Sequence, residues 1–244
     1  MQSNLKRMFA YSSVAQFGMI GAAVALANET ALLGGIVHLI GHGVMKFGLF
    51  LGIGLLALGY GTREFADLAS AARAAPYTSG AIAVLGLALV GIPPSIGFLG
   101  KWYIGVGAVD AGLAGGGPVG IAVAAAIFVS TLFTLSYVAR MIERFYFAGA
   151  GLPGDHGEAS GDGAAATDGG DSAAADGGER SVARTAEGLL APVKGAPRSS
   201  LVPDRVPTAP FLALGLAVLA TVALGFGGFA LAEWFGPFLT EVFA

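Results

Sequence analysis

Three ionisable side chains interrupt an apolar stretch early in the chain. His38, His42 and Lys46 are spaced four residues apart within GIVHLIGHGVMKFGLF. Because an α-helix has 3.6 residues per turn, this spacing places all three on one face, about one turn apart. Histidine titrates near neutral pH and burial favours neutral lysine. Such a stripe could therefore pass protons from one group to the next.

Burying this stripe in lipid is costly, so it needs water or polar partners. Each ionisable group near the bilayer centre costs about 2.5 to 3.5 kcal/mol. A hydrated internal path would meet that need. Other interpretations are snorkelling to an interface, neutral histidines bonded to backbone, haem held by opposing histidines, and a metal held by the H-x-x-x-H pair. No nearby carboxylate supplies a third metal ligand, and we predict neither metal nor cofactor.

A second basic residue follows a pair of prolines in GIPPSIGFLGKWYI. Pro93 and Pro94 remove two backbone donors, so a helix should break or end there. A break exposes backbone groups that attract water and charge, which makes it a suitable place for Lys101 as a protonatable group. Alternatively, Trp102 and Tyr103 beside this lysine would make it an interfacial anchor.

The stretch KRMFAYSSVAQFG offers further polar side chains at the start of an apolar run. Tyr11, Ser12, Ser13 and Gln16 could hold water or support the histidine and lysine stripe from a neighbouring helix. Hydroxyl and amide groups in membrane helices also commonly join one helix to another.

The composition is that of a membrane protein. Of the 244 residues 55% are hydrophobic and only 12% charged, and the mean hydropathy is +0.74, well beyond ordinary soluble domains. The absence of cysteine excludes disulfides and thiolate metal sites. No basic patch suits nucleic acid, and no nucleophile elbow, Walker loop or dinucleotide fingerprint suggests an independent enzyme active site.

Apolar runs predict an all-α polytopic protein with five to six transmembrane helices and one broken helix near Pro93–Lys101. The predicted runs cover residues 8–27, 31–60, 78–92, 97–109, 119–147 and 210–231. A polar connection, TREFADLASAARAAP, follows the second run. Lysine and arginine are nearly balanced between the two sides, so charge does not define the orientation.

Three regions follow from this pattern. Residues 1–148 would hold most of the transmembrane helices, and residues 208–244 the final one with an aromatic tail containing Trp234, Phe235 and Phe238. Between them, residues 149–207 carry nine acidic against five basic residues and few large apolar ones. Such a segment cannot offset the entropy of folding, so we predict a disordered, water-exposed acidic linker.

Four stretches in a fixed order carry a family resemblance: NLKRMFAYSSVAQFG, HLIGHGVMKFGLFLGIG, REFADLAS and GIPPSIGFLGKWYI. They resemble the proton-translocating antiporter-like subunits shared by respiratory complex I and Mrp-type Na+/H+ antiporters. The later stretch STLFTLSYVARMIERFYF, with GFLGKWYIGVGAV, is most similar to the D-type member of the Mrp system. The acidic linker resembles that of a halophilic archaeal member.

The resemblance implies a fold of two inverted five-helix repeats, each with a broken helix, and a hydrated mid-membrane axis of buried lysine, histidine and glutamate. It covers residues 3–147 and 207–231, which match only the second repeat and the closing helix. Lys46, His38 and His42 would then form the central proton relay, with Lys101 as the terminal lysine.

The resemblance also implies partners and a location. A separate chain would supply the first repeat with its glutamate and lysine pair, because this chain would be a split or truncated half. Other membrane subunits would complete a cell-membrane complex that carries H+ and Na+. The acidic linker would be cytoplasmic and the amino terminus would face outward. Membership of the membrane arm of an NADH or F420H2:quinone oxidoreductase, or a non-conducting scaffold role, are the alternatives.

Overall fold

Helices account for nearly all of the residues that this computed structural model describes, which are 4–61, 67–114, 117–147 and 208–243. The helices are α1 (Leu5–Ala25), α2 (Glu29–Tyr60), α3 (Leu68–Ala74), α4 (Pro76–Val90), α5 (Ile96–Leu113), α6 (Pro118–Tyr146), α8 (Ala209–Phe226) and α9 (Gly228–Phe243). The predicted all-α polytopic class is confirmed. The predicted acidic linker at 149–207 lies outside the described residues.

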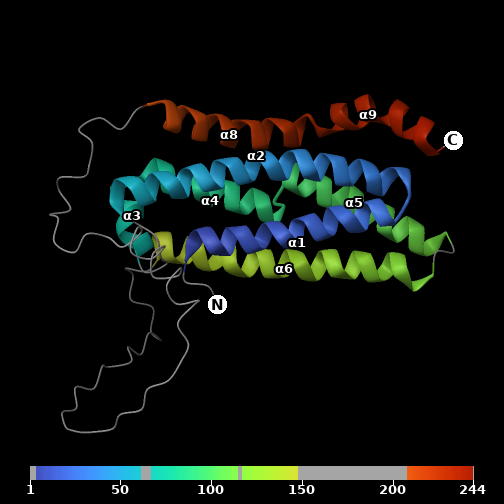
Figure 1. Cartoon of the computed structure of the whole chain (residues 1–244), viewed down its shortest axis with the longest axis horizontal. Coiled ribbons are helices and arrows are strands. Elements are labelled where there is room, and N and C mark those ends of the chain that lie inside the picture. Colours follow the sequence, from blue (N-terminus) through green and yellow to red (C-terminus); the bar gives the residue numbers. More distant parts are fainter. Residues whose placement is uncertain (1–3, 62–66, 115–116, 148–207, 244) are drawn as a thin grey trace, which may run out of the picture. The chain divides into compact units, whose positions relative to one another are not determined.

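Four helices, α1, α2, α6 and α8, are long and apolar enough to cross a membrane. The apolar helix α4 has 15 residues and is shorter than the ~20 that a bilayer requires. Figure 1 shows α5 continuing the path of α4 after a break. The two therefore serve as one discontinuous span, which α2 flanks along both halves.

The break between α4 and α5 has a local chemical cause. Helix α4 ends at Val90, and Gly91 follows with φ of 100°, a left-handed conformation that favours glycine. Pro93 and Pro94 then prevent the helix from continuing. Helix α5 restarts after Ser95, whose Oγ accepts a hydrogen bond from the Phe98 backbone N–H at 3.4 Å.

Helix α2 lies at the centre of the described bundle and contacts α1, α3, α4, α5, α8 and α9. Two of its glycines, Gly34 and Gly41, allow α5 to approach closely. A Cβ atom at these positions would overlap Ile104 and Ile96 of α5, respectively. Small residues at such contacts are how membrane helices gain packing area without a hydrophobic driving force between them.

The largest cluster of buried apolar side chains joins six helices. Its members include Leu5, Leu49, Leu68, Leu85, Val138 and Leu214, one from each of α1, α2, α3, α4, α6 and α8. This packing holds α1 and α4 against α2. It thereby fixes α1, which contacts the histidine and lysine stripe, and α4, whose last carbonyl oxygens accept hydrogen bonds from Lys101.

Two segments differ from the apolar-run predictions. The polar connection after α2 contains the short helix α3, because Leu68, Ala71 and Ala72 form one buried face. The predicted final run to residue 231 ends at Phe226, and the expected aromatic tail is the helix α9. Its Trp234 and Phe238 are exposed while Leu239 is buried. Consecutive glycines at 227 and 228 weaken the helix at this junction.

Candidate functional site

The histidine and lysine stripe lies on one buried face of α2. His38, His42 and Lys46 are 0%, 3% and 7% exposed. The helix is continuous from Glu29 to Tyr60, so the four-residue spacing brings the groups into line. The rings of His38 and His42 stack with centroids 6.1 Å apart and an interplanar angle of 26°.

Lys46 points into the bundle toward α1. Its Nζ donates to the Phe9 carbonyl oxygen at 2.6 Å and to Ser12 Oγ at 2.5 Å. The ammonium also lies 5.2 Å from the centre of the Phe9 ring and 5.9 Å from that of Phe50, within the range of cation–π attraction. These inward contacts do not fit a lysine that snorkels to an interface.

A side chain of α1 also contacts His38. Its Nε2 lies 2.9 Å from Oε1 of Gln16, a side chain that is 0% exposed. The Nδ1 atoms of His38 and His42 are buried without a hydrogen-bond partner among the described residues. Helix α1 thus supplies Ser12 and Gln16, four residues apart, to Lys46 and His38 on the antiparallel α2.

Lys101 of α5 caps the C-terminal end of α4, the first half of the broken helix. It is 8% exposed, and its Nζ donates to the carbonyl oxygens of Leu89 at 3.0 Å and Val90 at 2.8 Å. The last carbonyls of a helix lack partners within the helix and form the negative end of its dipole. The ammonium therefore points to the break, whereas the neighbouring Trp102 is 57% exposed. This geometry disfavours a mere interfacial anchor.

The Lys101 segment also contacts the stripe. Gly100 lies against His38 so closely that a Cβ there would overlap the His38 backbone and Cβ. The structure thus packs the segment that carries Lys101 against His38 of the stripe, and the two belong to different spans.

The predicted supporting residues divide into two pairs. Ser12 and Gln16 contact the stripe, as described above. Tyr11 is 61% exposed and is directed away from the stripe. The hydroxyl of Ser13 donates to the Phe9 carbonyl of its own helix at 3.3 Å, so the structure does not join it to the stripe.

Three residues of the site are missing from the sequence-based prediction. Phe50 continues the four-residue spacing of the stripe, so the pattern could have revealed it. Ser95 has the N-cap signature of a serine before an apolar run, and its Oγ also donates to the Ala88 carbonyl at 3.4 Å. Phe9 contributes a backbone carbonyl to Lys46, and no residue type signals that role.

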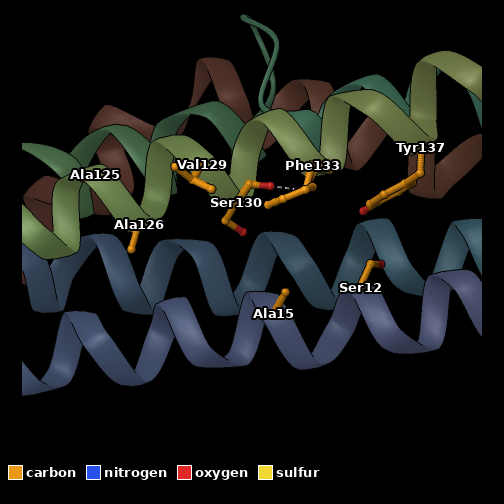
Figure 2. A pocket seen from close by; sticks show the side chains of 9 residues that line it. Ser12, Ala15, Ala125, Ala126, Val129, Ser130, Phe133 and Tyr137 are labelled. Carbon is orange, nitrogen blue, oxygen red and sulfur yellow. Dashed lines mark hydrogen bonds between the residues drawn. The ribbon is translucent and has the colours of Figure 1, made fainter. Parts of the chain in front are cut away.

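An open cavity of about 590 Å³ lies between α1 and α6. Its lining consists of Ser12, Ala15, Ala125, Ala126, Val129, Ser130, Phe133, Thr134 and Tyr137. Figure 2 shows the Tyr137 side chain reaching from α6 toward α1, where Ser12 lies. Because Ser12 also bonds Lys46, one side chain links this cavity to the stripe.

The side chains of the site, two lysines and two histidines, can each gain and lose a proton. Both lysine ammonium groups donate to neutral carbonyl or hydroxyl oxygen atoms. Loss of a proton from either lysine would therefore leave no carboxylate unpaired at these contacts. His42 lies one helical turn from Lys46 on α2, and His38 lies against Gly100, the residue before Lys101. Imidazole can take up and release protons near neutral pH. The arrangement is suited to proton exchange rather than to covalent catalysis.

The chain is similar in sequence to proteins named subunit N of an NADH-quinone oxidoreductase and of an F(420)H(2) dehydrogenase. It is 38% identical over 157 residues to the NADH-quinone oxidoreductase subunit N of Desulforudis audaxviator, an alignment covering 64% of this chain and 30% of that protein. It is 29% identical over 155 residues to the F(420)H(2) dehydrogenase subunit N of Methanosarcina mazei, covering 60% and 30%. The chain thus spans about a third of the length of these curated relatives.

Two solved structures share the fold. One is the Mrp complex from Dietzia sp. DQ12-45-1b, with a TM-score of 0.64, 24% identity and coverage of 100% of this chain and 45% of that chain. The other is respiratory complex I from Thermus thermophilus with bound NADH, with a TM-score of 0.66, 22% identity and coverage of 99% and 39%. At these identities the similarity supports the fold alone.

These relatives refine the expected resemblance. Both sequence relatives are called subunit N, so the finer assignment to the D-type member of the Mrp system is not confirmed, and nothing in these matches supports the halophilic archaeal type. The family model described as NADH:quinone oxidoreductase/Mrp antiporter, TM, matches residues 1–135. This chain therefore belongs to the NADH:quinone oxidoreductase/Mrp antiporter transmembrane family.

Proposed function

We propose that the chain is a proton-conducting membrane segment of a complex I-like quinone oxidoreductase. The observation that carries this proposal is the buried set of Lys46, His42, His38 and Lys101, which joins α2 to the break between α4 and α5. The names of the sequence relatives, NADH-quinone oxidoreductase subunit N and F(420)H(2) dehydrogenase subunit N, favour this assembly over an antiporter.

The proposed route follows the order of the groups along α2 and then crosses to α5. Lys46 exchanges a proton with His42, His42 with His38 beside it, and His38 with Lys101 through intervening water. Water is required because an imidazole and a lysine this deeply buried each need a polar neighbour to receive the proton. Each lysine returns to its neutral acceptors after the transfer.

The remaining parts of the assembly belong to the proposal too. The family resemblance implies a first repeat with a glutamate and lysine pair, and we include that repeat in the proposed assembly. Other membrane subunits complete the complex in the cell membrane. The acidic linker would lie on the cytoplasmic side.

Proton flux through the assembled complex in vesicles tests the proposal. Lys101→Ala is expected to abolish flux that a pH-sensitive dye reports inside the vesicles. Lys6→Ala removes an exposed lysine and is expected to leave flux intact. Unchanged flux in Lys101→Ala would remove that lysine from the mechanism.

A second candidate is a Na+/H+ antiporter of the Mrp type. The fold shared with the Mrp complex and the sequence resemblance to its D-type member support it. In that case a Na+ gradient drives proton movement, and small Mrp-type subunits co-purify. In the oxidoreductase, flavin and iron–sulfur subunits co-purify and a reduced electron donor drives the protons.

The remaining candidate is a non-conducting scaffold. Simultaneous apolar replacement of His38, His42 and Lys46 separates it from both transport functions. Intact assembly with intact flux in this triple variant would favour the scaffold, because the relay could not operate without these groups.

A further inference from the structure

A buried amide faces a buried imidazole between α1 and α2. Gln16 and His38 are both 0% exposed, and Gln16 Oε1 lies 2.9 Å from His38 Nε2. Their other nitrogen atoms, Gln16 Nε2 and His38 Nδ1, have no hydrogen-bond partner among the described residues. The contact between the two side chains is therefore the one polar contact that the described residues give His38.

The orientation of the Gln16 amide, whose oxygen faces His38 Nε2, selects one tautomer. An amide oxygen only accepts a hydrogen bond, so the bond requires the proton of neutral His38 to reside on Nε2. The lone pair then resides on Nδ1. In metal sites and catalytic triads the bond made by one ring nitrogen likewise determines the state of the other.

We propose that Gln16 is a positioning residue that makes His38 load and unload protons through Nδ1 alone. A proton that adds to the Nδ1 lone pair gives an imidazolium with both nitrogens protonated. Release from Nε2 would require a base beside it, and the Gln16 amide is not one. The proton therefore leaves from Nδ1, which restores the starting tautomer.

The consequence for transport rests on the proposed function. If both steps use Nδ1, then His38 holds a proton and returns it to groups on that side, instead of passing it through the ring from one nitrogen to the other. The stacked ring of His42, whose own Nδ1 is also unpartnered among the described residues, is the neighbouring titratable group on α2. Lys101 approaches from α5, where Gly100 packs on His38.

The histidine content makes the tautomer measurable. The chain has three histidines, His38, His42 and His156. Solid-state NMR of the full chain in lipid bilayers, labelled with 15N-histidine, separates protonated from bare ring nitrogens. His156→Ala and His42→Asn assign the signals. We expect neutral His38 to show a protonated Nε2 and a bare Nδ1.

Two substitutions distinguish positioning from packing. Gln16→Met keeps the volume and loses the acceptor, and we expect the ratio of the two His38 tautomers to change at least about fivefold, as the loss of one hydrogen bond implies. Gln16→Glu retains an acceptor with the same reach and should keep the Nε2–H signal. If Gln16 only filled space, Gln16→Glu would change the His38 signals more than Gln16→Met does, because a buried site tolerates a carboxylate less well than a thioether. Val14→Ala, at a position that is 70% exposed, should leave the spectrum unchanged.

The outcomes separate this inference from the proposed function. An Nδ1–H tautomer in the wild type, or a Gln16→Met spectrum identical to it, would overturn the inference whatever the flux. A changed tautomer with at least a fivefold loss of flux in the assembled complex would support it. A changed tautomer with unchanged flux would overturn the positioning role. A wild-type complex that moves no protons would refute the proposed function, while the spectra would still decide the tautomer.

Discussion

Lys101 Nζ lies 2.8 Å from the carbonyl oxygen of Val90, the last residue of α4. A lysine from α5, the second half of the broken span, thus caps the C-terminal end of α4, the first half. The hydrogen bond spans 11 residues of sequence and crosses the Pro93 and Pro94 break. Any proton transfer from this ammonium must therefore leave the end of α4 without its cation, which couples the protonation of Lys101 to the break.

The first prediction concerns this lysine. Lys101→Met should abolish proton flux but lower the free energy of unfolding by no more than about 3 kcal/mol. Removal of the buried lysine recovers about 2.5 to 3.5 kcal/mol, whereas the two carbonyls that lose their partner cost about 1 to 3 kcal/mol each. Flux assays and thermal unfolding in detergent measure the two effects. Collapse of the fold in Lys101→Met would instead assign a structural role to this residue.

The second prediction concerns the contact between Ser12 and Lys46. Ser12→Ala removes one of the two oxygen acceptors of the Lys46 ammonium and leaves the Phe9 carbonyl. Loss of a hydrogen bond to a charged group corresponds to about 1.5 to 3 kcal/mol, so we expect flux to fall by at least about tenfold. The comparison is Ser70→Ala, which removes an exposed hydroxyl from α3 and should leave flux unaltered. Equal flux in both variants would show that Ser12 does not serve Lys46.

Local features of the site were predictable from sequence. The spacing of His38, His42 and Lys46 defines a helical face because all three lie within one helix. The break at Pro93 and Pro94 depends on the backbone chemistry of proline itself. Such features need no knowledge of how distant segments pack.

The partners of these groups were less accessible to prediction. Phe9 and Lys46 are 37 residues apart, and Gln16 and His38 are 22 apart, so their contacts depend on the rotation of α1 against α2. Adjacent residues on a helix point about 100° apart. That rotation turns Ser12 toward Lys46 and leaves Tyr11 exposed, and the hydroxyl-rich sequence does not distinguish them. The helix α9 was not predicted, because its aromatic residues suit both an irregular tail and an amphipathic helix.

The third prediction concerns the close approach of α8 to the break. A Cβ at Gly225 would overlap the carbonyl of Pro94 and the backbone of Ser95. Gly225→Ala should therefore lower the free energy of unfolding by about 1 to 3 kcal/mol, the usual cost of overpacking. In the same helix, a Cβ at Gly215 meets nothing within 4 Å, so Gly215→Ala should be neutral or slightly stabilising. Thermal unfolding of both variants in one detergent checks this order, and equal midpoints would argue against close packing at the break.

The fourth prediction concerns the start of α2, where one asparagine has two roles. Asn28 Oδ1 accepts from the Ala31 backbone N–H at 2.8 Å and caps the helix, while Nδ2 donates to the Gly107 carbonyl of α5 at 2.9 Å. Asn28→Asp preserves the acceptor and loses the donor. We expect it to reduce the free energy of unfolding by up to about 2.5 kcal/mol, since the lost bond to the Gly107 carbonyl costs about 1 to 3 kcal/mol and the carboxylate gains only about 0.3 to 1 kcal/mol at the helix N-terminus.

Asn4 provides the matched comparison, because it caps α1 by accepting from the Arg7 backbone N–H at 3.2 Å. Asn4→Asp keeps that acceptor and places a negative charge at a helix N-terminus, where it stabilises by about 0.3 to 1 kcal/mol. The two aspartate variants should therefore shift the unfolding midpoint in opposite directions. If both shift it alike, the bond from Asn28 to Gly107 does not hold α2 against α5. The alignment of His38 with Gly100 and Lys101 would then have to depend on the glycine contacts and the apolar packing between α2 and α5.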